Sequence, residues 1–205
     1  QAADGSGSAD SGWFPFTATQ TFTVEPPAFV WAATMQVRPF VKVFVRDTYL
    51  DGRGSMQGSA LGIVPVVEAT SAPELHAGAL LRYLAEAAWV PPALLPSHRL
   101  RWEPVDARHA RATLTDGSVT VSAVFEFAAS GDIVGVSAER PRATDRGYET
   151  TLWEGRFWDH QERDGMRIPT KGEVAWILDG IRQPYWRGQI SAAEYDFPAA
   201  AAAGS

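Results

Sequence analysis

The sequence contains no cysteine, no run of basic residues and no long apolar run. The absence of cysteine excludes disulfides, thiolate catalysis and cysteine-ligated metal sites. The formal net charge is −6 and no basic, aromatic-rich ribbon is present, so nucleic acid is not an expected partner. Because no window of about 18 apolar residues and no signal peptide is visible, we expect a soluble protein of the cytoplasm or the cell envelope.

The composition favours one folded domain. At 205 residues and 45% hydrophobic content, the chain can bury a sizeable core. Neither a linker nor an internal repeat divides residues 13–197, whereas residues 1–12 and 198–205 are rich in small residues and have nothing to pack. We therefore predict a single domain over residues 13–197 with disordered or cloning-derived ends.

Alternation of apolar and polar residues with period two predicts a mainly β structure. Residues 16–24 and 29–37 are expected to form a hairpin, 41–49 the next strand, and 55–67 one bulged strand. After residue 100, alternating runs are separated by Asp-Gly and Ser-Gly pairs, which are strong hairpin signals. About eleven strands result, and accumulated twist should curl them into an antiparallel sheet or half-barrel.

The period changes to that of a helix between residues 73 and 95. Pro73 is typical of a first helical position, and Leu80 and Leu84 share one apolar face. The helix should end before the next proline pair and be followed by a short apolar turn of helix. We expect this helical insert to cover the concave face of the sheet with Leu80, Leu84 and Trp89.

Several phrases resemble those of a bacterial protein family of unknown function. They are FTATQ and FVWAA near the start, then LLRYLAEAAWVPPALLP, DGMRIPTKGEVAW and PYWRG. In plan, the family resembles the lipoprotein-carrier half-barrels of the LolA/LolB type, in which a curved sheet wraps helices and shelters an acyl chain. Members of the family usually carry another helix and strand before the segment that begins at Trp13. The resemblance implies that the first strand of this chain is missing or supplied differently.

The aromatic content predicts an apolar ligand cavity. The chain has eight Trp, ten Phe and five Tyr, and such side chains predominate in the walls of small-molecule sites. Core packing explains any single Trp more simply, so the hypothesis depends on their number. The candidate ligand-binding residues are Trp31, Tyr83, Trp89, Trp102, Trp153, Trp158 and Trp186.

Asp47, Tyr49, Glu86 and His98 are candidates for acid–base chemistry. Asp47 and Tyr49 share a strand face, where a carboxylate and a phenol can exchange a proton, although this pairing is also common at strand ends. Glu86 lies one helical turn after Arg82, a spacing that favours a surface ion pair. If the helix is buried, Glu86 could instead orient a ligand or act as a general base.

Other patterns give weaker indications. Glu154, Arg156 and Trp158 share a strand face and form either an ion pair across the sheet or a polar patch in a cavity. The histidines show none of the spacings of metal sites, and the glycine-rich run at residues 52–55 precedes a strand rather than a helix. We therefore expect no metal and no cofactor.

Three functions are compatible with these features. The first is binding of a hydrophobic small molecule or acyl chain in an apolar cavity of the half-barrel. The alternative is an enzyme of the same fold that acts on a bulky apolar substrate by acid–base chemistry, of the isomerase or cyclase type. The third is a structural or scaffolding domain whose aromatic residues only fill the core. No sequence feature indicates the oligomeric state.

Overall fold

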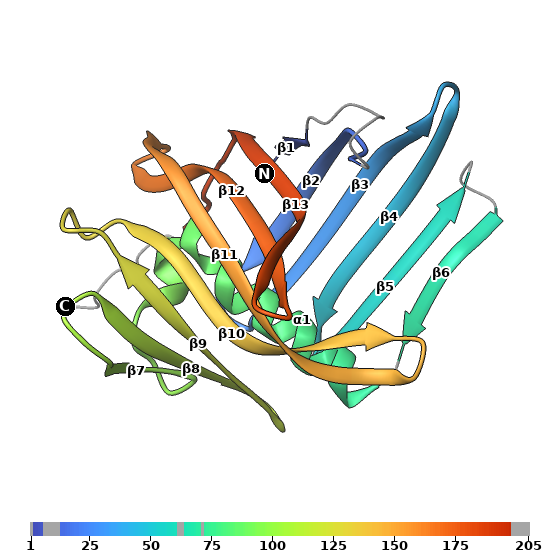
Figure 1. The fold of residues 1–205 in the computed structure, drawn as a ribbon. Coiled ribbons are helices and arrows are strands. Elements are labelled where there is room, and N and C mark those ends of the chain that lie inside the picture. The colour runs from blue at the N-terminus through green and yellow to red at the C-terminus, as the bar shows by residue number, and fades with distance from the viewer. Residues whose placement is uncertain (1, 6–12, 61–63, 71, 198–205) are drawn as a thin grey trace, which may run out of the picture.

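The computed structural model describes residues 2–5, 13–60, 64–70 and 72–197, and these residues are mainly β (Figure 1). They form thirteen strands, one α-helix and two short 3₁₀-helices. The bounds are β1 (Ala2–Gly5), β2 (Phe16–Thr23), β3 (Ala28–Arg38), β4 (Val41–Leu50), β5 (Arg53–Ala60), β6 (Val64–Thr70), α1 (Pro73–Glu86), η2 (Ala87–Trp89), η3 (Pro91–Leu94), β7 (Leu100–Pro104), β8 (His109–Asp116), β9 (Val119–Phe127), β10 (Ile133–Thr144), β11 (Gly147–Arg163), β12 (Met166–Leu178) and β13 (Ile181–Ala192).

The strands of this described part belong to one antiparallel sheet, as predicted. Their order is β6-β5-β4-β3-β2-β1-β13-β12-β11-β10-β9-β8-β7, so the sheet is open, with β6 and β7 at its edges. We call β2 to β6 the first arm and β7 to β13 the second arm; β1 joins them. The two arms bend toward each other, and Figure 1 shows α1 between them.

The strand β1 corrects the prediction of a disordered N-terminus. Residues Ala2–Gly5 pair with β2 on one side and with β13 on the other. A short strand here satisfies backbone groups of two strands whose facing sides would otherwise be unpaired, and this needs no apolar side-chain pattern. A strand therefore lies before the segment that begins at Trp13. Residues 6–12 and 198–205 lie outside the described residues.

A second correction concerns the segment predicted as one bulged strand at residues 55–67. The chain forms two strands here, β5 and β6, which pair antiparallel, for example Ser55 with Thr70. The predicted irregularity is present as a register shift between Gly58 and Ser59. Residues 61–63, between these two strands, lie outside the described residues.

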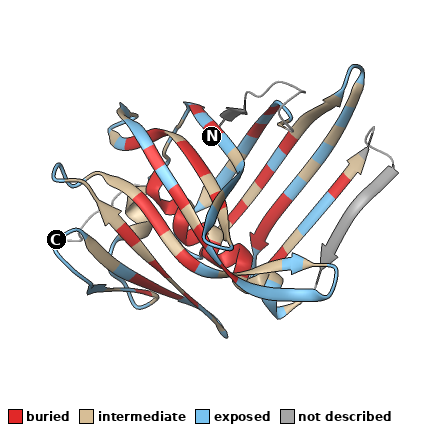
Figure 2. Cartoon of the chain, in the orientation of Figure 1, coloured by how far each residue is buried: buried red, intermediate tan, exposed pale blue. Residues whose placement is uncertain are grey.

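The helix α1 is part of the core. It contacts β4 and β5 of the first arm and β9 and β10 of the second. From Gly78 to Ala85 every residue except Arg82 is buried (Figure 2). A helix that is apolar on nearly all sides is stable only when it is surrounded, so the expected covering of the concave face is confirmed. No helix of the described residues is long and apolar enough to span a membrane.

The close contact between α1 and β5 depends on Gly54. A Cβ at this position would lie 2.6 Å from Cβ of Ala79 and 2.7 Å from the carbonyl oxygen of Leu75. We expect Gly54→Ala to lower the free energy of unfolding by about 1 to 3 kcal/mol, because overpacking displaces the helix.

Urea unfolding measures this loss, and Gly78→Ala is the matched control. At Gly78 the nearest atom to an added Cβ, Nε of Arg140, is 3.8 Å away, an ordinary contact. That control should be neutral or should stabilise the helix by about 1 kcal/mol. Equal losses for both variants would contradict the close-contact explanation.

Candidate functional site

A cavity of about 140 Å³ lies between the two arms, against the helical insert. Its walls are mostly aromatic or aliphatic, as is typical of small-molecule sites. The lining residues are Trp31, Asp47 and Met56 of the first arm, Arg82, Ala85, Glu86 and Trp89 of the insert, and Arg140, Trp153, Phe157, Val174, Tyr185 and Trp186 of the second arm.

Strand alternation directs several of these aromatic rings inward. In β3, Trp31 is buried and its neighbour Ala32 is exposed, and in β11 the buried residues Trp153 and Phe157 lie on either side of Gly155. Successive side chains of a strand point to opposite faces, so residues two apart line the same face. The cavity wall therefore follows from the period-two pattern in these two strands.

An irregularity in β13 adds two consecutive aromatic residues. Trp186 lies opposite Val174 of β12, but Pro184 lies opposite the next residue, Ala175, so Tyr185 is the extra residue of a β-bulge. A bulge re-aims side chains locally, and here both Tyr185 and Trp186 line the cavity.

Arg82 is at the centre of a buried ion cluster at one side of the cavity. Its Nε lies 2.8 Å from Oε1 of Glu86, and its Nη1 forms an ion pair with Oδ2 of Asp47. The guanidinium also lies over the rings of Phe29 and Trp31, at 4.9 and 5.0 Å from their centroids. Side-chain exposures of 16% for Arg82 and 14% for Glu86 correct the predicted surface ion pair: the helix is surrounded, so the pair is buried with it.

Arg82 is held in its charged form by its two carboxylate partners. Burial disfavours the charged form of Arg82, but the charges of Glu86 and Asp47 outweigh this and raise the pKa of Arg82 above its ordinary value. The second oxygen of Glu86, Oε2, accepts a hydrogen bond of 2.8 Å from Gln20. Both oxygens of Glu86 therefore have donors, which disfavours a role for this carboxylate as a general base.

Arg140 lies on the other side of the cavity, and its partners are neutral. Its Nη2 donates to the carbonyl oxygen of Gly78 at 3.1 Å, and its Nη1 donates to the hydroxyl of Tyr185 at 3.3 Å. Its guanidinium lies 5.4 Å from the ring centroid of Trp153 and 5.9 Å from that of Trp176. Contacts with two aromatic faces and two neutral acceptors hold this cation in place.

Two nitrogen atoms of the lining residues are buried without a hydrogen-bond partner. They are Nε1 of Trp89 and Nε of Arg140. Buried polar groups in proteins almost always have partners, and a buried donor without one is costly. Both atoms are donors, so a hydrogen-bond acceptor is the group that would satisfy either of them.

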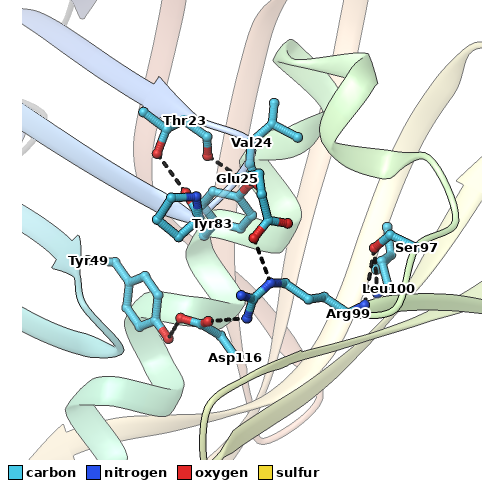
Figure 3. Close-up of polar contacts among 10 residues, drawn as sticks. Thr23, Val24, Glu25, Tyr49, Tyr83, Ser97, Arg99, Leu100 and Asp116 are labelled. Carbon is cyan, nitrogen blue, oxygen red and sulfur yellow. Dashed lines mark hydrogen bonds and ion pairs between the residues drawn. The ribbon is translucent and has the colours of Figure 1, made fainter.

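Tyr49 lies outside the cavity, in a polar cluster that joins the ends of the two arms (Figure 3). Its hydroxyl donates to Oδ2 of Asp116 at 2.9 Å, while Nη1 of Arg99 lies 2.7 Å from Oδ1 of the same carboxylate and Nε of Arg99 lies 3.0 Å from Glu25. We call Tyr49, Asp116, Arg99 and Glu25 the inter-arm cluster. Burial, reinforced by the hydrogen bond to Asp116, raises the pKa of Tyr49, so its phenol is neutral near neutral pH.

The other predicted residues lie in three different settings. Tyr83 is buried, stacks on Phe22 at 4.2 Å between ring centroids and donates to the carbonyl oxygen of Thr23. Trp102 packs against Phe125 and donates to the carbonyl oxygen of Leu94. His98 and Trp158 are exposed. None of these four lines the cavity, whereas Trp31, Trp89, Trp153, Trp186, Asp47 and Glu86 do.

The predicted trio of β11 lies away from the cavity. Glu154 lies 3.5 Å from Nε of Arg182 in β13, while Arg156 and Trp158 are exposed. Of the two readings of this strand face, the structure favours the ion pair across the sheet. No group of three or more His, Cys, Asp or Glu residues in the described ranges is placed to hold a metal ion.

A larger hollow, of about 550 Å³, lies between α1 and strands β8 to β11. It occurs where β10, after Ser137, continues without pairing to β9. Its walls include Ser122, Ser137 and Glu139, and none of the predicted ligand-binding or catalytic residues lines it. We take the smaller aromatic cavity as the candidate site because polar and aromatic groups converge on it.

Residues 4–195 match the model of a family described as being of unknown function, DUF6920. The chain belongs to the DUF6920 family. No curated protein and no solved structure matches it. The predicted membership of a family of unknown function is thus confirmed, while the likeness in plan to carriers of the LolA/LolB type stays a prediction.

The lining residues of this DUF6920 protein that were not predicted as site residues include Arg140 and Tyr185. The polar residues from Arg140 onward lack the apolar alternation that predicts a strand, but β10 continues through Arg140 to Thr144. The bulge beside Tyr185 was not predicted. Pro184 was the available signal, because a proline within a strand often marks a bulge.

Proposed function

We propose that this protein binds a small molecule through a compact hydrophobic group, such as an aromatic ring or the end of an acyl chain. The observation that supports this most is the aromatic cavity of about 140 Å³ between the arms. An apolar cavity of about 150 Å³ can bind benzene, so this volume suits one ring or a few methylene groups. A complete long acyl chain exceeds it.

The acid–base enzyme has less support. Its candidate carboxylates at the cavity, Asp47 and Glu86, are both paired with Arg82. Of its other candidates, Tyr49 is bonded to Asp116 and His98 is exposed. A purely structural role has less support for a different reason, because unpaired buried donors and an apolar hollow both favour a ligand.

Iodobenzene titration tests the proposal. The iodine atom quenches tryptophan fluorescence at short range, and Trp31, Trp89, Trp153 and Trp186 line the cavity. We expect saturable quenching in the wild type and its loss in Ala85→Phe, where the new ring occupies the cavity.

The matched control is Ala32→Phe, which places the same ring on an exposed strand position and should quench like the wild type. Native mass spectrometry of freshly purified protein gives an independent readout of a bound molecule. Quenching that is absent in the wild type, or equal in Ala85→Phe, would remove the support for a ligand cavity.

A further inference from the structure

We infer that the ligand is an organic anion whose carboxylate, sulfonate or phosphate group binds Arg140 while its hydrophobic group enters the cavity. This inference rests on the proposed function and specifies its ligand class. Three observations support it. Arg140 has no carboxylate partner among the described residues, the buried atoms without a partner are donors, and the cavity is more exposed at Tyr185 than at its aromatic wall.

Of the charged residues that line the cavity, all but Arg140 belong to ion pairs. Asp47 and Glu86 both pair with Arg82. Arg140 forms no ion pair with any carboxylate of the described residues; its protein partners are a carbonyl oxygen, a hydroxyl and two aromatic rings. These neutral contacts fix the guanidinium without neutralising its charge. An arginine held in this way is suited to a planar or tetrahedral anion, which accepts charge-assisted hydrogen bonds.

The hydrogen-bonding groups of the wall also favour an anion. Among the described side chains, every buried nitrogen or oxygen atom without a partner is a donor nitrogen, and Trp89 and Arg140 contribute two of these at the cavity. On the acceptor side, both oxygens of Glu86 already receive hydrogen bonds. A ligand rich in acceptors therefore fits this wall better than a cation or a donor-rich ligand.

Burial gives the direction in which such a ligand would lie. Tyr185, which bonds Arg140, is 45% exposed, whereas Trp31, Trp89 and Phe157 are buried. The end of the cavity at Tyr185 is thus nearer to solvent than the wall formed by Trp31, Trp89 and Phe157. A carboxylate or phosphate at Arg140 would remain near water while the apolar group displaces water from the aromatic floor.

A pair of ligands that differ only in charge tests the inference. We would titrate the protein with phenylacetate and with phenylacetamide, and measure both affinities by calorimetry. We expect phenylacetate to bind at least about tenfold more tightly, because a hydrogen bond to a charged group is worth more than one to a neutral amide. The advantage of phenylacetate should shrink with added salt, and the affinity for phenylacetamide should not change.

Variants then assign the effect to one side chain. Arg140→Met should remove the preference for phenylacetate and leave the affinity for phenylacetamide within a few-fold of the wild type. Arg140→Lys keeps the charge and should retain part of the preference. Arg156→Met is the matched control, because Arg156 is exposed and does not line the cavity.

The outcomes separate the two proposals. If iodobenzene binds but phenylacetate has no advantage over phenylacetamide in the wild type, the anion inference fails and the proposed function stands. If none of the three probes binds, both fail. Should Arg140→Met not fold, the wild-type comparison and its salt dependence still decide the question. A preference that persists unchanged in Arg140→Met would also overturn the assignment.

Discussion

Arg82→Met is expected to lower the free energy of unfolding by about 3 to 5 kcal/mol, because it leaves Asp47 and Glu86 enclosed without their cation. The cost comes from the desolvation of two carboxylates rather than from the loss of favourable pairing alone. The guanidinium also covers the rings of Phe29 and Trp31, so its removal weakens packing between α1 and β3. Chemical denaturation monitored by circular dichroism measures the loss.

Two further variants separate these contributions. Arg101→Met removes an exposed arginine 3.7 Å from Glu103 and should change stability by less than about 1 kcal/mol. The triple variant Asp47→Asn, Arg82→Met, Glu86→Gln removes all three charges and should recover most of the stability lost in Arg82→Met. A triple variant as unstable as Arg82→Met would show that packing, and not uncompensated charge, sets the effect.

Two of the predicted catalytic residues, Asp47 and Glu86, belong to this cluster. The spacing of Arg82 and Glu86 indicated that they pair, but not that a third partner, Asp47, joins them from β4. One cation shared by two carboxylates ties the helix to the first arm. The same cluster forms a polar side of an otherwise aromatic cavity, so the same three residues join the helix to the first arm and line the cavity.

Local sequence patterns predicted most of the fold. Asp164-Gly165 and Asp179-Gly180 adopt positive φ at both positions and form two-residue turns between long strands. The backbone geometry of such turns depends on the two residues themselves, so an Asp-Gly pair predicts the turn without knowledge of the rest of the chain. The helical insert was predictable for the same reason, since its apolar period and Pro73 are local features.

The missed features depend on distant parts of the chain. The strand β1 exists because β2 and β13 both need a neighbour, and no pattern within Ala2–Gly5 indicates this. Arg140 lies in a stretch of β10 without apolar alternation, and its place beside Gly78 and Tyr185 is set by the packing of α1 against the second arm. Aromatic content predicted a cavity, but only the tertiary structure shows which tryptophans line it.

Asp116→Ala is expected to lower the free energy of unfolding by about 2 to 4 kcal/mol. Asp116 receives hydrogen bonds from the buried hydroxyl of Tyr49 and from Arg99, and its loss leaves that hydroxyl without an acceptor. The inter-arm cluster connects β4 to the end of β8, two strands far apart in an open sheet. Hydrogen exchange should therefore show faster opening of the arm ends in the variant. Glu103→Ala, which breaks an exposed ion pair, is the control and should have almost no effect.

A double-mutant cycle with Tyr49→Phe shows whether the two arms are coupled through this contact. Tyr49→Phe alone should cost about 1 kcal/mol, because Asp116 keeps its bond to Arg99. In the Tyr49→Phe background, Asp116→Ala no longer leaves a buried hydroxyl without an acceptor. The loss of unfolding free energy in the double variant should therefore be smaller than the sum of the single losses, by about 0.5 to 2 kcal/mol. Strictly additive losses would mean that Tyr49 and Asp116 stabilise their own arms independently. The open sheet would then be held together by α1 and β1 rather than by the inter-arm cluster.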